Sequence, residues 1–168
     1  GTGPTFQLVS KVLTRERAVK LSKQMLCVDT DVVLLGVYVP PSNSDYYANT
    51  EIENGIAMVE QCILDIVEQF GDVSLLLFGD FNARTGCKVP DVDTVPDDVI
   101  DLDSSCDYSV AQRISKDSVV NGFGNHLLNV CEQFSLSLLN GLLDGEGSGD
   151  FTYVSATGCS VNDYFLIS

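Results

Sequence analysis

The chain has 168 residues, 45% of them apolar, which is enough for a single domain with a sizeable core. Its net charge of −15 argues against simple electrostatic attraction to nucleic acid, which normally comes from Lys and Arg that neutralise phosphates. No apolar run reaches the ~20 residues of a membrane-spanning helix, and the N-terminus lacks the basic and apolar segments of a signal peptide.

The first part of the chain predicts strands. Residues 6–13 indicate a strand, and residues 15–20 a polar turn. Two apolar runs, at residues 25–28 and 32–39, flank a short polar segment and predict a β-hairpin. Two prolines follow at residues 40–41 and must end the second strand, because proline cannot donate to a sheet.

A helix and a central strand come next. From about residue 47 to residue 70, apolar residues recur at spacings of three and four, which predicts an amphipathic helix that Gly71 ends. Residues 73–78 form a nearly unbroken apolar run that is too short for a buried helix. We therefore expect a strand buried on both faces and covered by that helix.

Two polar side chains, Asp80 and Asn82, follow this strand two positions apart. Residues i and i+2 of an extended segment point the same way, so both polar groups can converge on one spot. A carboxylate and a carboxamide delivered to a sheet edge can form a phosphate or metal site. The same residue types also favour a plain turn, and the spacing alone leaves both interpretations open.

The second half begins with an acidic segment without periodicity. Residues 88–118 carry eight Asp and predict a solvated surface loop within the domain. A helix then follows in which Leu127, Leu128, Cys131 and Phe134 face the core, with His126 as a structural residue at its start. Short strands are expected at residues 135–139, at residues 151–154 and near the end of the chain.

The six cysteines include no C-x-x-C pair, and several fall within apolar segments. They are typical of small buried hydrophobes in a reducing compartment. Together with the missing signal peptide, this predicts an intracellular protein, nuclear or cytoplasmic.

Four segments together resemble one known family. G-D-F-N-A at residues 79–83 resembles the signature of the endonuclease/exonuclease/phosphatase superfamily, a group of metal-dependent phosphodiesterases. Y-V-P-P-S at residues 38–42, R-I-S-K-D at 113–117 with the following L-L-N-V-C, and N-D-Y-F-L-I at 162–167 resemble the same family in the same order. Within this superfamily, the four segments are most similar in sequence to the endonuclease domain of non-LTR (LINE-type) retrotransposons.

The resemblance implies a fold and a set of catalytic residues. The fold is an α/β sandwich of four layers, with two packed β-sheets flanked by helices. Asp80 would orient or deprotonate the attacking water, and Asn82 would bind phosphate or support the metal. Tyr38 would hold a phosphate oxygen, with a core or rim tyrosine as the alternative. Asp163 would be a metal ligand or a polar support, and the implied metal is Mg²⁺, with Mn²⁺ as a substitute, held by Asp80, Asn82 and Asp163.

The resemblance also suggests residues that line a substrate groove. Arg113, Asp117 and Asn121 are candidates, and so is Thr152, which matches a family position where a Thr precedes an aromatic residue. Arg113, Asp117 and Asn121 can equally be hydrogen bonders that fix loops.

The implied function is Mg²⁺-dependent phosphodiester hydrolysis by the DNA-nicking domain of a retrotransposon polyprotein that also carries a reverse transcriptase. Two alternatives remain: a phosphoesterase acting on a small phosphate or lipid, and a degenerate relic that serves as a binding module. The family's Glu ligand is expected before residue 1, and its closing Ser-Asp-His element after Ser168. We therefore interpret residues 1–168 as one partial domain that is inactive by itself.

Overall fold

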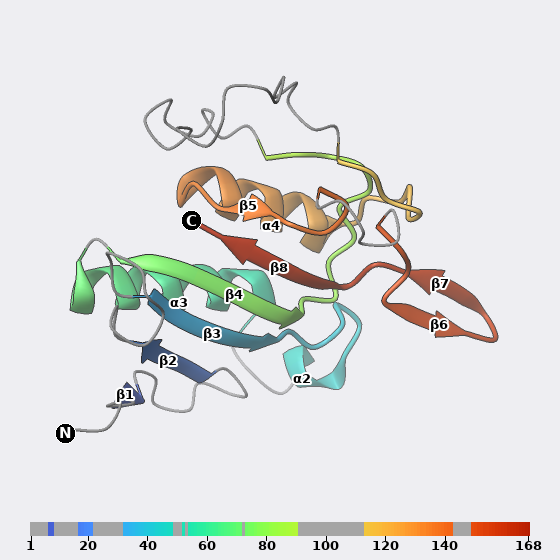
Figure 1. Ribbon diagram of the computed structural model, residues 1–168. Helices are drawn as coiled ribbons and strands as arrows, with labels where there is room; N and C mark the ends of the chain where they lie inside the picture. The colour runs from blue at the N-terminus through green and yellow to red at the C-terminus, as the bar shows by residue number, and fades with distance from the viewer. Residues whose placement is uncertain are drawn as a thin grey trace, which may run out of the picture.

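The computed structural model describes residues 7–8, 17–21, 32–48, 52, 54–71, 73–90, 113–142 and 149–168. Within these ranges, a six-stranded sheet lies at the centre, with strand order β1-β2-β3-β4-β8-β5 (Figure 1). Its strands are β1 (Gln7–Leu8), β2 (Arg17–Leu21), β3 (Val32–Tyr38), β4 (Ser74–Asp80), β8 (Asp163–Ile167) and β5 (Ser137–Leu138). A separate hairpin, β6 (Tyr153–Ser155) and β7 (Gly158–Ser160), extends beyond one end of the sheet.

The middle of the sheet is built from one parallel pair of strands. β3 and β4 run parallel, while β2 and β8 pair with them in antiparallel fashion on either side. Parallel neighbours need a crossover connection. Here the crossover contains α2 (Asp45–Ala48) and α3 (Gly55–Phe70).

Each of the two long helices has a clear start. Asn54 caps α3, its side chain accepting a hydrogen bond from the backbone N–H of Ile56, and Asn121 caps α4 (Gly122–Gln133) in the same way through Gly124. α3 ends at Gly71, whose backbone N–H donates to the carbonyl of Val67. The helix therefore begins later than residue 47, because an Asn at the N-cap satisfies the first free N–H groups.

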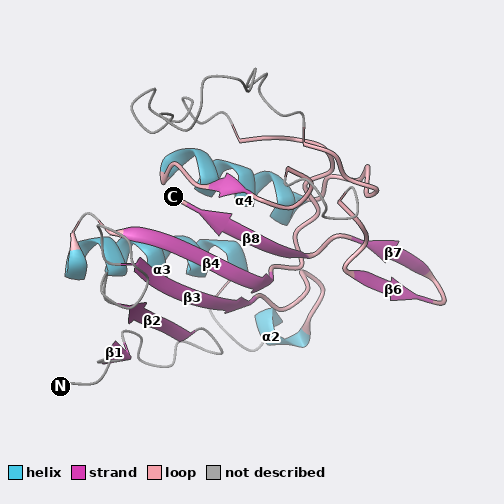
Figure 2. Ribbon diagram, viewed as in Figure 1, coloured by secondary structure: helices cyan, strands magenta, loops and turns pink. Residues whose placement is uncertain are grey.

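Both helices lie on the same face of the sheet (Figure 2), and the core fills the space between the helices and that face. The alternation along β3 and β4 turns every second side chain inward. The buried apolar side chains of β3, β4, β5 and β8 are Val33, Leu35, Val37, Leu75, Leu77, Leu138, Tyr164 and Leu166. Those of α3 and α4 are Ile56, Val59, Cys62, Ile63, Ile66, Phe123, Leu127, Leu128, Val130 and Cys131.

The opposite face of the sheet, the outer face, is apolar and uncovered in the part of the chain that the structure describes. Phe78 is 38% exposed, Phe165 54% and Ile167 39%. The rings of Phe78 and Phe165 stack with centroids 6.2 Å apart. The prediction that this strand is buried on both faces is therefore wrong, because α3 and α4 cover the inner face alone.

Three further predictions need comment. Most of the expected polar turn at residues 15–20 is strand, since β2 pairs with β3 over five residues. The first strand of the expected hairpin, residues 25–28, lies outside the described residues. Within the expected surface loop, residues 91–112 are also outside them, whereas Arg113 and Asp117 are buried rather than solvated.

The architecture is α/β, with mixed pairing in the sheet. Of the helices in the described ranges, none combines the length and the apolar character needed to cross a membrane.

Candidate active site

Three candidate residues lie in one row across three neighbouring strands. In the sheet register, Tyr38 of β3 pairs with Asp80 of β4, and Asp80 pairs with Asp163 of β8. Directly paired residues point to the same face, so the three side chains emerge together on the outer face. Because β8 runs antiparallel to the other two, its first residue meets their last ones at a single edge of the fold.

The environment of Asp80 disfavours its ionised form. Its Oδ1 accepts a hydrogen bond of 2.9 Å from the backbone N–H of Asn82. Burial raises the pKa of Asp80, and the negative charge of Asp163 adds to this, whereas the hydrogen bonds from Asn82 oppose it. A second negative charge that raises the pKa of Asp80 is the kind of surrounding that a bound cation would relieve.

The backbone around Asp80 and Asn82 is closely constrained. Gly79 has φ 137°, and a Cβ atom there would lie 2.0 Å from the carbonyl oxygen of Val37, so glycine is required before Asp80. Asn82 adopts φ 47°, and its Nδ2 donates to the carbonyl of Val39 at 2.8 Å. This contact fixes the amide so that Oδ1 is the end that can accept a hydrogen bond or bind a cation.

The start of β8 is held by two side chains. The hydroxyl oxygen of Thr152 accepts from the backbone N–H groups of Asn162 and Asp163, at 2.9 and 3.1 Å. The Nδ2 of Asn140 donates to the carbonyl of Asp163, and its Oδ1 accepts from the N–H of Phe165. The sequence analysis did not identify Asn140 as a positioning residue. Thr152 is thus placed where it positions Asp163.

Asn121 ties the loop after Asp80 to α4. Its Oδ1 accepts from the backbone N–H groups of Arg84 and Gly124, at 3.0 and 2.7 Å. Its Nδ2 donates to the backbone carbonyl of Asn82 at 3.3 Å. These contacts favour the loop-fixing interpretation of Asn121.

Asp117 forms a bidentate ion pair with Arg84, whose Nε and Nη2 donate to the two carboxylate oxygens at 2.7 and 2.6 Å. The same carboxylate accepts from the backbone N–H groups of Val119 and Val161. Burial by itself raises the pKa of Asp117, but the hydrogen bonds from Arg84, Val161 and Val119 outweigh it and hold the pKa below its usual value. The sequence analysis missed Arg84, although it stands two residues after Asn82 in the motif.

Arg113 is 1% exposed and anchors loops from inside the protein. Its Nε donates to the carbonyl of Asn140, and its Nη1 donates to the Thr85 hydroxyl and to the carbonyls of Gly86 and Lys88. A guanidinium so enclosed has the surroundings of a loop-fixing residue rather than of one that lines an open groove.

The row offers oxygen ligands for a cation. Among the described residues, no three His, Cys, Asp or Glu side chains gather into a metal-binding group. Asp80 and Asp163 nevertheless supply two carboxylates, with the Oδ1 of Asn82 nearby. Mg²⁺ prefers oxygen and is often held by one or two carboxylates while it keeps several waters. The donor set therefore fits Mg²⁺ better than a metal that prefers nitrogen or sulfur.

No protein-family model matches the chain, and a search of curated proteins finds no match either.

Proposed function

We propose that this chain belongs to a Mg²⁺-dependent phosphodiesterase domain that nicks DNA, of the kind found in retrotransposon polyproteins. The observation that carries the proposal is the register that brings Tyr38, Asp80 and Asp163 into one row. The motif resemblance supports DNA as substrate and a reverse transcriptase in the same polyprotein.

Phosphodiester hydrolysis needs an activated water and stabilisation of charge on the phosphoryl oxygens. Asp80 would orient the water or accept its proton. The Tyr38 hydroxyl would donate to a phosphoryl oxygen. Asp80 and Asp163 would hold Mg²⁺ with the Oδ1 of Asn82, and the bound ion would supply positive charge against the phosphate.

The four-layer sandwich is part of the same proposal. A second sheet packed on the outer face would bury the exposed side chains of Phe78, Phe165 and Ile167. Sheets that pack face to face bury apolar side chains from both, and an uncovered aromatic pair is the pattern that such packing requires. The second sheet would come from a longer parent chain.

A nicking assay tests the function. The chain, extended by its natural flanking sequence, is incubated with supercoiled plasmid and Mg²⁺, beside Asp80→Asn and the control Glu68→Gln, which removes a charge from an exposed position on α3. We expect metal-dependent nicking that falls by about 10²–10⁴ in Asp80→Asn and not in the control.

The same preparation is tested on bis(p-nitrophenyl) phosphate. Hydrolysis of this ester without nicking of plasmid would favour the small-molecule phosphoesterase instead. Failure to cleave either substrate with Mg²⁺ or Mn²⁺ would overturn the proposed function. A non-catalytic binding module would then be the remaining interpretation.

A further inference from the structure

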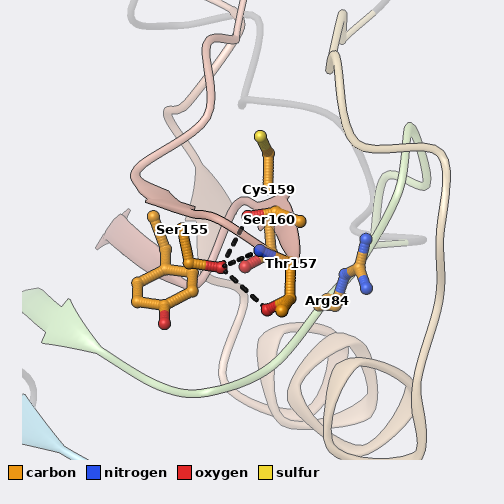
Figure 3. A pocket seen from close by; sticks show the side chains of 7 residues that line it. Arg84, Ser155, Thr157, Cys159 and Ser160 are labelled. Carbon is orange, nitrogen blue, oxygen red and sulfur yellow. Dashed lines mark hydrogen bonds between the residues drawn. The ribbon is translucent and has the colours of Figure 1, made fainter.

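A hollow of about 200 Å³ lies between the β6–β7 hairpin and the loop that follows β4 (Figure 3). The loop contributes Arg84, and the hairpin contributes Tyr153, Ser155, Thr157, Cys159 and Ser160. None of the residues that line it is acidic. In a chain with a net charge of −15, this combination of a cation and several hydroxyls is unusual.

Ser160 carries a buried hydroxyl that has no hydrogen-bond partner among the described residues. It is 8% exposed, and its Oγ makes no hydrogen bond within the described part of the chain. Buried polar groups are almost always hydrogen-bonded, because an unmet donor costs the full loss of its hydration. Ser160 also lines the hollow, so a ligand there can accept its hydrogen bond.

The guanidinium of Arg84 is held rigidly at the other side. Its Nε and Nη2 are fixed by Asp117, so Nη1 and the second hydrogen of Nη2 can serve a ligand. The charge of Asp117 is shared with the backbone N–H groups of Val119 and Val161, so Arg84 does not neutralise it alone. The Arg84 side chain is 29% exposed, and its oriented guanidinium suits the fork geometry of phosphate oxygens.

The remaining hydroxyls are acceptors. Ser155 Oγ donates to the carbonyl of Gly158, so its hydrogen bond with Thr157 Oγ1 must take its proton from Thr157 (Figure 3). The Ser155 oxygen also accepts from the backbone N–H of Thr157, so Thr157 Oγ1 is the one of the two that keeps lone pairs for a ligand. Arg84 and Ser160 both offer hydrogen-bond donors to the hollow.

We infer that this hollow binds a phosphate group, and in the proposed nuclease a phosphate of the nucleic-acid backbone away from the cut bond. The assignment of this phosphate to a nucleic acid rests on the proposed function. Arg84 and Ser160 donate to the phosphate oxygens, and Tyr153, 52% exposed beside them, offers a ring to the adjoining sugar or base.

Thiol protection tests this inference without any catalytic step. Cys159 lines the hollow, whereas the other exposed thiol of the described residues, Cys87, does not. Residues 1–168 are treated with iodoacetamide in EDTA, and the rate at each cysteine is followed by peptide mass spectrometry. Inorganic phosphate and the oligonucleotide dT4 are the two probes. EDTA removes divalent metal, so failure here is separate from failure of the nicking assay.

We expect either probe to slow the labelling of Cys159 and not that of Cys87. Protection by dT4 alone assigns the site to the nucleic-acid backbone, and protection by inorganic phosphate alone assigns it to free phosphate. Ser160→Ala should raise the probe concentration that gives half-maximal protection roughly three- to tenfold, because one hydrogen bond to the phosphate is lost. The melting temperature of this variant should stay equal or rise. Arg84→Lys should weaken protection further. Unchanged labelling of Cys159 with both probes, or full protection in Ser160→Ala, would overturn the inference.

Discussion

Asp80 of β4 lies directly opposite Asp163 of β8 in an antiparallel pair, although most of the second half of the chain separates them in sequence. On one side, β4 is held by its parallel register with β3. On the other, hydrogen bonds with Asn140 and Thr152 hold the start of β8. Two acidic groups are thus held together by backbone contacts that do not depend on their charges. A backbone that holds two like charges close together is expected where a cation binds.

Asp80→Asn is expected to stabilise the folded chain while it removes activity. The folded-state pKa of Asp80 lies above its ordinary value of 3.8. Its contribution to stability is therefore present at low pH and is lost as the pH rises through the folded pKa, so the ionised group is a cost at neutral pH. Thermal unfolding at about pH 7 should give a higher melting temperature for the variant, and the gain should vanish below about pH 4.

Asp163→Asn provides the matched comparison, because it removes the charge that faces Asp80. It should lower the pKa of Asp80 and also raise the melting temperature at neutral pH. A lower melting temperature in both variants would show that the carboxylates stabilise the fold instead.

Asp117→Asn is expected to have the opposite effect, with a loss of about 2–4 kcal/mol in unfolding free energy at neutral pH. The variant leaves Arg84 without its counter-charge and turns an NH₂ group toward N–H donors. The folded pKa of Asp117 lies below 3.8, so its contribution is present above that value and is lost as the pH falls through the folded pKa. Urea unfolding from about pH 7 to about pH 2 should show the difference from wild type shrinking in acid. A difference that does not depend on pH would contradict the role of the charge.

Local patterns in the sequence predict the helices and the pair Asp80 and Asn82, because each depends on neighbours along the chain. The face of α4 is an example, since Leu127, Leu128 and Cys131 are all buried as their spacing indicates. What local patterns do not contain is pairing between distant segments. The register of β4 with β8 decides that Asp163 meets Asp80, and it follows from packing of the whole sheet.

For the same reason, the sequence left Arg113 and Asp117 open between a substrate groove and loop-fixing hydrogen bonds, and it did not single out Arg84. Arg113, Arg84 and Asp117 are charged residues of the kind that usually lie in exposed loops. Carbonyls from other segments nevertheless surround Arg113, and N–H groups from other segments surround Asp117. Charged residues become buried only where such partners surround them, and sequence alone does not place the partners.

Gly124→Ala should be strongly destabilising, by more than about 3 kcal/mol, because overpacking against backbone cannot relax easily. A Cβ atom at Gly124 would lie 1.8 Å from the carbonyl oxygen of Arg84. Gly122, in the same turn of α4, meets nothing within 4 Å and is the matched control. Gly122→Ala should be neutral or stabilising by up to about 1 kcal/mol, since alanine favours helix. Equal effects in the two variants, measured by chemical unfolding, would contradict the close approach of α4 to the loop after β4.

The outer face of the sheet should make residues 1–168 self-associate. Phe165, 54% exposed and stacked on Phe78, lies at its centre, and exposed apolar surface of this kind is buried on association. Phe165→Thr removes the ring but keeps a residue that favours strands, so the sheet should survive. In sedimentation velocity over a range of concentrations, we expect the wild type to grow in apparent mass and Phe165→Thr to stay closer to a monomer.

Val154→Thr is the control for this experiment, because Val154 is 70% exposed on the β6–β7 hairpin and away from the outer face. It loses apolar surface at a more exposed position, yet it should associate as the wild type does. If Val154→Thr reduced association as much as Phe165→Thr, exposed apolar area in general would be the cause and not the outer face. A wild type that remains monomeric throughout would mean that the outer face is not adhesive in solution, which would also weaken the case for a second sheet packed against it.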